Sequence, residues 1–493
     1  MRKWCMLAVV ALLGACGDTT DPFGNDISIH LTADSVVLAP GETQHVSVIV
    51  TGTTDHVSLT SLDTAIATID SAGTVTAKTP GTTYIVAAVR TLRDSAKVIV
   101  RTTGPAPIPR LGSGLVTERY TGEVAAAGGW AYTTTWSQRF VAGASNSGNA
   151  VKIWDVSGPA PVLKDSLIVA GAGTTGDVQI SDDGKLLAVA IEGSSLGNGF
   201  ALYDRTDPGK PTLVKQYVSS ATQPGVHTLK FGRVNNTLYL FLAIDPPPAL
   251  VALDLTTPAN PVEVLNRSMG NPFLHDVFVR AGVLFVALWD GGMSILDLGG
   301  AARGGSPANP VLLGNVKTHS CEACGGATTS SVHNIWWFHD PASGSKRYAF
   351  VGEEVPGLIG AQSRGDIHVV DVSDFSNPRE VAFYDVDSTT TSNGRYAGTH
   401  NFDVDEASGV LYAAYYNGGV RALDIRGDLS SCSAAQKSGD GRCNLRLMRR
   451  ELAQGLNDIG STYIWGVRLV GNFLYASDML NGLHKLDISA LKR

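Results

Sequence analysis

One short sequence motif recurs seven times between residues 151 and 487, and this repetition restricts the folds that the chain can adopt. Each copy is an apolar run that ends in Asp, and in five copies a Pro follows and begins another apolar run. Spacing of this size is typical of repeat architectures in which one small sheet recurs. Functional residues are therefore expected on the faces of an array of sheets. The seven aspartates lie 43 to 74 residues apart and are Asp155, Asp204, Asp254, Asp297, Asp371, Asp424 and Asp487.

The unit at residues 262–310 shows the repeat in full. It contains four apolar runs, separated by a loop, a Gly turn and an Asp-Gly-Gly loop, and it ends in the Pro-bearing turn. Four short strands per unit is the composition of a propeller blade. We therefore predict a seven-bladed β-propeller over residues 111–493. Its units begin near residues 113, 162, 212, 262, 311, 379 and 446.

Two copies of the motif match a known family. Residues 369–378 read Val-Val-Asp-Val-Ser-Asp-Phe-Ser-Asn-Pro, and residues 252–261 read Ala-Leu-Asp-Leu-Thr-Thr-Pro-Ala-Asn-Pro. On these motifs the C-terminal part resembles the LVIVD-repeat β-propellers. The sixth unit departs most from the pattern, because an insertion replaces its Asn-Pro turn. The resemblance implies an exported propeller protein, and it implies no particular reaction.

Residues 27–100 carry a different pattern, in which polar and apolar residues alternate over short segments. Such alternation is typical of half-buried strands. Residues 38–43, 61–69 and 73–82 resemble the bacterial immunoglobulin-like group 2 family. That resemblance implies a small β-sandwich, used as a stalk or an adhesive module, or as a spacer that holds the next domain away from a membrane.

A stiff linker is expected over residues 101–110, where three prolines stand in a short polar run. The predicted fold class is therefore all-β: a small Ig-like β-sandwich over 27–100, followed by a seven-bladed LVIVD-type β-propeller over 111–493.

The N-terminus predicts export. Two basic residues precede an apolar run at residues 6–13, which is too short to span a bilayer as a mature helix. The run ends in Leu-Gly-Ala-Cys16, which resembles a lipoprotein signal whose Cys is acylated and becomes the new N-terminus. We predict a signal peptide over 1–15, lipidation at Cys16 and a polar tether over 16–26. The expected location is the bacterial cell envelope, lipid-anchored at a membrane and either periplasmic or surface-exposed.

The charge balance argues against nucleic acid as a partner. The formal net charge is −7, and only 17% of residues are charged. Such a chain offers no basic field to a polyanion. Its 55 glycines suit tight turns between short strands.

The repeated aspartates have a structural explanation. In several copies a Ser stands two positions after the Asp, as in Asp155-Val-Ser157 and Asp371-Val-Ser373. An Asp at a strand end can accept backbone N–H bonds and close an Asx-type turn. Because one copy per blade is what such a turn requires, we do not place the functional site there.

A second repeat position carries the candidate chemistry. At the start of the predicted innermost strand, successive units have Gly122, Gly176, His227, His275, His333, His400 and Trp465. Four of the 11 histidines therefore fall at one position in four consecutive blades. Carboxylates are expected on the same face, near the ends of second strands, and Asp290, Glu353 and Glu354 are the candidates nearest the histidines. Imidazoles and carboxylates together could bind a divalent transition metal or a polar ligand. Copying of an ancestral repeat, with each His bonded to its own loop, explains the pattern equally well.

Four cysteines remain after the expected processing, and an exported location favours disulfides. Cys321 and Cys324 precede an innermost strand, whereas Cys432 and Cys443 flank an insertion after Asp424 on the opposite face. A disulfide between a cysteine of one set and a cysteine of the other would have to pass from one face of a blade to the opposite face. We therefore predict Cys321–Cys324 and Cys432–Cys443. The alternatives are a metal site that uses Cys321, Cys324 and nearby histidines, and a redox-active pair.

Two functions from different classes follow. The first is a membrane-anchored lipoprotein whose propeller binds a protein, glycan or small ligand on its loop face. The second is a metal-dependent enzyme, with copper or zinc held by the His cluster at the channel mouth. Its architecture is similar to the selenium-binding-protein propellers, which implies an oxidase of small thiols. Convergence of the four histidines on one point would discriminate between these two functions.

Overall fold

The computed structural model describes residues 27–492, except 34, 102–103, 271–272, 322–323, 325–329, 356, 361–362, 387–396 and 458–460. The predicted signal peptide, Cys16 and the whole predicted tether (16–26) lie outside the described residues. The chain divides into two compact units: the first ends at Gly104 and also includes Asp340–Ser345 and Arg426–Ser433, and the second contains the other residues from Pro105 onward. No helix among the described residues has the length and hydropathy needed to cross a membrane.

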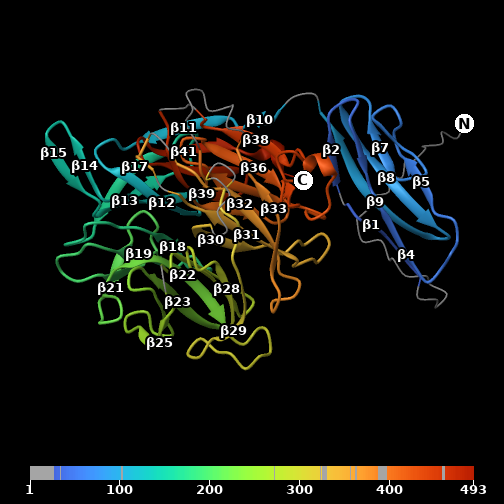
Figure 1. Ribbon diagram of the computed structural model, residues 1–493. Helices are drawn as coiled ribbons and strands as arrows, with labels where there is room; N and C mark the ends of the chain where they lie inside the picture. Colours follow the sequence, from blue (N-terminus) through green and yellow to red (C-terminus); the bar gives the residue numbers. More distant parts are fainter. Residues whose placement is uncertain are drawn as a thin grey trace, which may run out of the picture. The chain divides into compact units, whose positions relative to one another are not determined.

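The first unit is a β-sandwich (Figure 1). Its larger sheet has the order β2-β9-β8-β5, and the others are β3-β7-β6 and β1-β4. In β8 and β9 buried and exposed positions alternate, so one face of this sheet covers a core that includes Ile85, Val98 and Ile29. The strands are β1 (Ser28–Leu31), β2 (Ser35–Leu38), β3 (Thr43–His45), β4 (Val48–Thr51), β5 (Ser58–Ser61), β6 (Ala67–Ile69), β7 (Thr74–Ala77), β8 (Gly81–Val89) and β9 (Leu92–Val100).

Among the described residues, the second unit forms seven sheets of four or five strands, which we number as propeller blades 1 to 7 (Figure 1). Blade 1 contains β12 (Tyr120–Ala127), β13 (Trp130–Trp136), β16 (Ala150–Asp155) and β17 (Val162–Ile168), with the hairpin β14 (Gln138–Val141) and β15 (Ala144–Ser147). Blade 2 contains β18 (Val178–Ile180), β19 (Leu186–Ile191), β20 (Gly199–Asp204) and β21 (Thr212–Tyr217). Blade 3 contains β22 (Val226–Val234), β23 (Thr237–Ile244), β24 (Ala249–Asp254) and β25 (Val262–Ser268). Blade 4 contains β26 (Asp276–Arg280), β27 (Val283–Ala287), β28 (Met293–Asp297) and β29 (Val311–Val316).

The last three blades recruit strands from elsewhere in the chain. Blade 5 contains β30 (Val332–Trp337), β31 (Tyr348–Glu353), β32 (Ile367–Asp371), β33 (Arg379–Tyr384) and β37 (Cys443–Asn444). Blade 6 contains β34 (Phe402–Asp405), β35 (Val410–Ala414), β36 (Val420–Asp424), β38 (Glu451–Gly455) and β10 (Ala106–Pro107). Blade 7 contains β39 (Ile464–Val470), β40 (Phe473–Asp478), β41 (Gly482–Asp487) and β11 (Arg110–Leu115). Two short 3-10 helices, Ala434–Gln436 and Ser489–Leu491, complete the described elements.

The ring is closed by a strand from the start of the propeller. β11 pairs antiparallel with β41, so the first propeller segment completes the last blade. β12 also contacts both β18 and β39, which places blade 1 between blades 2 and 7. β10 pairs with β38 of blade 6, so part of the segment predicted as a linker over 101–110 belongs to the propeller sheets.

The middle strands of each blade are apolar because they are covered on both faces. Every residue of β27 is buried, whereas the outer strand β17 exposes Val162 and Ile168. Strands that pack on both faces are continuous apolar runs instead of alternating ones. The repeated aspartates close the turns as predicted: Asp155 Oδ1 accepts hydrogen bonds from the backbone N–H and the hydroxyl of Ser157.

In blades 4 and 6 the loop between the second and third strands pairs with the first strand of the next blade. Trp289 pairs with Val332 of blade 5, and Tyr416 pairs with Ile464 of blade 7. Both loop residues have positive φ, 50° for Trp289 and 41° for Tyr416. A bulky residue with positive φ is uncommon and is often found where a ligand or catalytic group is held.

Candidate functional site

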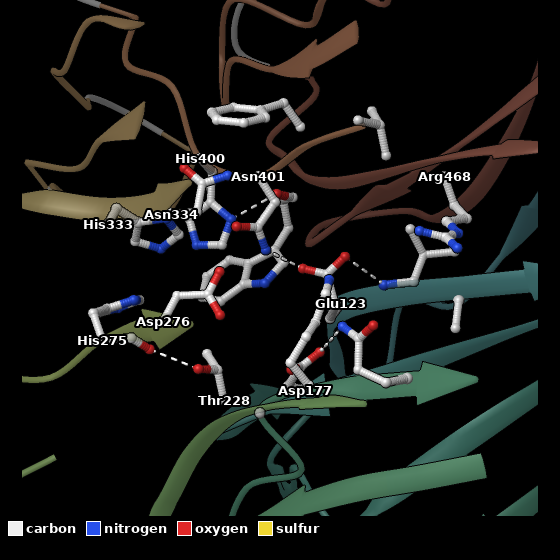
Figure 2. Close-up of a pocket in the computed structure, with 18 of the residues that line it drawn as sticks. Glu123, Asp177, Thr228, His275, Asp276, His333, Asn334, His400, Asn401 and Arg468 are labelled. Carbon is white, nitrogen blue, oxygen red and sulfur yellow. Dashed lines mark hydrogen bonds between the residues drawn. The ribbon is translucent and has the colours of Figure 1, made fainter. Parts of the chain in front are cut away.

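The four histidines of the repeat position lie side by side around the propeller axis. His227 and His333 lie near the starts of β22 and β30, and His275 and His400 stand just before β26 and β34. Their ring centroids are separated by 4.3 Å from His227 to His275, 4.0 Å from His275 to His333 and 4.2 Å from His333 to His400. Figure 2 shows three of the rings, His275, His333 and His400, in one row. Four consecutive blades thus deliver four imidazoles to one place.

Two tryptophans close this row into a ring of six aromatic side chains. The Trp465 ring lies 4.1 Å from His400, and Trp136 lies 5.1 Å from Trp465 and 5.9 Å from His227. Trp136 comes from the second strand of blade 1. A Cβ on Gly176 would lie 2.9 Å from the carbonyl oxygen of His227, so a side chain at this position would press on the backbone of the neighbouring blade.

The Nε2 atoms of the imidazoles turn toward one another and toward Glu354. His227 Nε2 and His275 Nε2 are 2.9 Å apart. One carboxylate oxygen of Glu354 lies 3.9 Å from His275 Nε2 and 3.6 Å from His333 Nε2, and the other lies 3.9 Å from His400 Nε2. The Tyr416 hydroxyl donates a hydrogen bond to Glu354. Three imidazoles thus share one buried carboxylate.

Two of the four imidazoles are oriented through their other ring nitrogen. His227 Nδ1 lies 3.0 Å from Glu192 Oε1, and His400 Nδ1 lies 2.7 Å from the carbonyl oxygen of Trp465. Nδ1–H donates to these acceptors, which leaves Nε2 as the nitrogen that faces the cluster. Histidines that bind metals are almost always held by such a contact.

Burial controls the charge of this cluster. It holds the pKa values of His275, His333 and His400 well below the ordinary value, so these rings are neutral near pH 7. Burial alone would also lower the pKa of His227, but the Glu192 carboxylate raises it to about 9. Burial raises the pKa of Glu354 to about 6. Neutral imidazoles present free lone pairs, which is the form that binds a metal ion.

His333 shows that the cluster is not satisfied internally. Its side chain is 2% exposed, and among the described residues neither of its ring nitrogens has a hydrogen-bond partner. His275 Nδ1 is also buried without a hydrogen-bond partner among the described residues. Burying a polar group without a hydrogen-bond partner costs about 1–3 kcal/mol. A ligand that bonds to these ring nitrogens would therefore stabilise the folded protein.

A second polar layer follows the histidines along the axis. The residue after each repeat position is Glu123, Asp177, Thr228, Asp276, Asn334, Asn401 or Gly466 in blades 1 to 7. Together with the histidines, six of these line a cavity of about 80 Å³ (Figure 2). Burial raises the pKa values of Glu123 and Asp276 to about 7. Asn401 donates a hydrogen bond to Glu123, and Thr228 donates one to the carbonyl oxygen of His275 at 2.7 Å.

The predicted carboxylates separate into three cases. Glu354 faces the histidines, as described above. Glu353 instead lies beside Cys321, Cys324 and His368, because adjacent strand residues point to opposite sides. Asp290 makes no hydrogen bond or ion pair with the four histidines within the described part of the chain. Glu192 is also a carboxylate at the end of a second strand on the histidine face, the position where carboxylates are expected, but its contact with His227 is not predicted from the sequence. Trp136 and the Glu123 layer are not predicted either.

The cysteines form disulfides. Cys321 and Cys324 are bonded to each other, and Cys432 and Cys443 are both disulfide-bonded as well. The Cys321–Cys324 bond excludes these sulfur atoms as metal ligands in the oxidised protein.

The strand order and the imidazole row define a β-propeller with a nitrogen-lined centre. Residues 27–100 match the family described as bacterial Ig-like domain (group 2), and residues 275–318, 361–386 and 462–491 match the LVIVD repeat. The chain therefore joins a bacterial Ig-like (group 2) domain to a propeller that carries LVIVD repeats.

Similar solved structures are distant. The WD40 β-propeller domain of Doa1 is 11% identical with a TM-score of 0.45, and the match covers 76% of this chain and 95% of that chain. The computationally designed Ika8 protein is 10% identical with a TM-score of 0.44, and the match covers 77% of this chain and 99% of that chain. A search of curated proteins found no match. The propeller assignment accordingly depends on the strand order and the repeats.

Proposed function

We propose that this protein is a transition-metal-binding propeller, tethered to the cell envelope by a lipid on Cys16. The repeat-built propeller supports a binding or scaffold role in general. The specific proposal depends on one observation: His275, His333 and Glu354 each bring one ligand atom within 4.8 Å of the others, and His227 and His400 flank them in the row of imidazoles. The ligands would be His227, His275, His333 and His400, and Glu354 would balance part of the charge of the ion.

The side chains proposed as ligands indicate which class of metal ion the site would bind. Imidazole suits zinc, copper, iron and nickel, whereas calcium and magnesium prefer oxygen. His227 Nε2 and His275 Nε2 are 2.9 Å apart and are hydrogen-bonded to each other, so a bound ion would replace this bond. Among the metals that imidazole suits, the general affinity series places copper above zinc.

The cavity beside the imidazoles supports a second candidate, a metal-dependent enzyme. Its volume of about 80 Å³ has room for several water molecules or a ligand of a few heavy atoms. A small thiol is the substrate that we would test first. Binding of a protein or glycan on the loop face is compatible with the same central ion.

Metal analysis of the purified full chain tests the proposal. After loading with Cu²⁺ or Zn²⁺ and desalting, mass spectrometry should find about one ion per chain, with copper held more tightly. The double variant His275→Ala/His400→Ala should lose at least 100-fold in affinity, because two of four ligands are removed.

A matched control is His484→Ala. His484 is buried in the same propeller but is paired with Asp478 at 3.2 Å and Ser113 at 2.7 Å. This variant should keep the metal even if its melting temperature falls. Absence of metal binding at micromolar concentrations, or equal loss in both variants, would show that the four histidines are only repeated architecture.

A further inference from the structure

The Cys321–Cys324 disulfide is asymmetric in its exposure. Cys321 is fully buried, whereas Cys324 is partly exposed. A thiolate from solution can therefore approach Cys324, and Cys321 becomes the leaving sulfur. Attack on one accessible sulfur is how disulfides are reduced, through a mixed disulfide.

A buried carboxylate stands beside the leaving sulfur. Both sulfur atoms lie within 4.8 Å of a carboxylate oxygen of Glu353, whose residue is 1% exposed. Burying a carboxylate is costly unless it has partners or a use. Glu353 accepts a hydrogen bond from the Asp366 backbone N–H at 3.2 Å. At this range one bridging water could carry a proton between Glu353 and the sulfur.

A chain of titratable groups connects Glu353 with solvent. His368 Nε2 lies 3.5 Å from Glu353, and His368 Nδ1 lies 2.9 Å from Glu380. Glu380 lies 2.8 Å from His319 Nδ1, and the His319 side chain is 44% exposed. Arg442 and, through His319, Asp440 complete the charged surroundings of Glu380. Protons could thus pass between the surface and the buried sulfur.

The bond itself contributes little to stability. It joins residues only three apart in sequence. A disulfide stabilises mainly by restricting the unfolded chain, and the effect grows with loop length. A four-residue loop therefore contributes little to stability through the disulfide.

We propose that Cys321–Cys324 is a reversible redox site that exchanges electrons with an external dithiol, and that Glu353 transfers the protons. A donor thiolate attacks Cys324 Sγ, the disulfide breaks, and Cys321 Sγ leaves and takes a proton through Glu353. The second donor thiol gives its proton to the same path and attacks the donor sulfur of the mixed disulfide, which releases Cys324. The donor becomes a disulfide, and two electrons and two protons end on the cysteine pair.

Reduction of the native full chain by dithiothreitol tests this proposal. Alkylation and mass spectrometry of the cysteine peptides should show Cys321–Cys324 reduced at least tenfold faster than the disulfides of Cys432 and Cys443. Glu353→Gln should slow the reduction about tenfold and flatten its pH profile. Glu353→Asp, which keeps the carboxyl group, should restore part of the rate.

Glu118→Gln, in blade 1, is the matched control and should leave the rate unchanged. Circular dichroism checks that each variant is folded, and Glu353→Asp keeps the test valid if Glu353→Gln does not fold. The proposal is overturned if the bond resists reduction until the protein unfolds, or if Glu353→Gln keeps the normal rate and pH profile. None of these measurements depends on whether the central histidines bind metal.

Discussion

Two buried histidine clusters lie next to the end of strand β31, and they differ in how many carboxylates balance the imidazoles. Glu354 faces His275 and His333, whereas the preceding residue, Glu353, faces His368. In the first cluster His275, His333 and His400 are neutral and share the Glu354 carboxylate, whereas His227 is charged beside Glu192. In the second cluster one imidazole stands between two carboxylates, Glu353 and Glu380.

The pKa values reflect this difference. Burial alone would lower the pKa of His368, but Glu380 and Glu353 raise it to about 10. Burial would raise the pKa of Glu380, but His368 and Arg442 lower it to about 2. By contrast, burial keeps the pKa of His333 well below its usual range. Equal burial therefore produces a charged ring in one cluster and a neutral ring in the other.

The comparison shows that burial of histidine does not by itself mark a binding site. A cluster whose charges balance, such as His368 with Glu380, needs nothing from outside. A cluster with more imidazoles than carboxylates gains free energy when a cation enters. Unpartnered nitrogens alone do not separate the two clusters, because His368 Nε2 is also buried without a hydrogen-bond partner among the described residues. The ratio of imidazole to countercharge separates the two cases.

The largest expected effect is on the paired cluster. His368→Ala leaves Glu380 and Glu353 without their buried cation, so we expect a loss of about 3 kcal/mol in the free energy of unfolding. Metal content should stay the same. Urea unfolding and mass spectrometry on the same sample measure both quantities. A variant that loses metal without losing stability would reverse our assignment of the two clusters.

The pH dependence of that loss identifies its cause. The raised pKa of His368 gives stability that is complete below pH 6.5 and is lost as pH rises toward 10. The lowered pKa of Glu380 gives stability that is complete above pH 4.5 and is lost as pH falls toward 2. The difference between wild type and His368→Ala should therefore be greatest between pH 4.5 and 6.5. A difference that does not change with pH would indicate lost packing instead.

The unpaired cluster should respond in the opposite direction. His333→Leu removes two unpartnered buried nitrogens and keeps the volume, so the metal-free protein should gain about 1–2 kcal/mol in stability while metal binding falls. His484→Leu, at a paired histidine, should lose stability. Melting curves in the presence of a chelator make the comparison, and destabilisation by His333→Leu would mean that this ring is a structural cap.

The sequence predicted the architecture because each blade repeats the same local pattern. Apolar runs that end in Asp form the third strand of every blade among the described residues, and in blades 1 and 5 the Ser two positions later bonds to the Asp and closes the turn. The same alignment of repeats brought His227, His275, His333 and His400 to one position. Convergence follows from the repeat, since equivalent positions in adjacent blades lie at the same height.

Contacts between non-equivalent positions could not be predicted in this way. Ring closure by β11 joins residues more than 360 positions apart in sequence, as the pairing of Ser113 with His484 shows. Trp136 enters the aromatic ring from a second strand, so no repeat alignment contains it. Glu353 and Glu354 were taken together because they are adjacent, but strand geometry sends them to different clusters.

The smallest expected effect is on metal affinity. It tests whether the adjacent residues Glu353 and Glu354 belong to different clusters. Glu354→Gln keeps the shape of the side chain and removes the charge that faces His275, His333 and His400. Outer-shell groups of this kind typically change metal affinity 10- to 100-fold, and we expect about tenfold because the carboxylate also accepts the Tyr416 hydroxyl. Glu353→Gln, one residue away, should leave copper affinity within twofold of wild type. Isothermal titration with Cu²⁺ on both variants measures the difference. Equal effects on affinity would mean that the two clusters are electrostatically one site, whereas the expected result assigns each carboxylate to its own cluster.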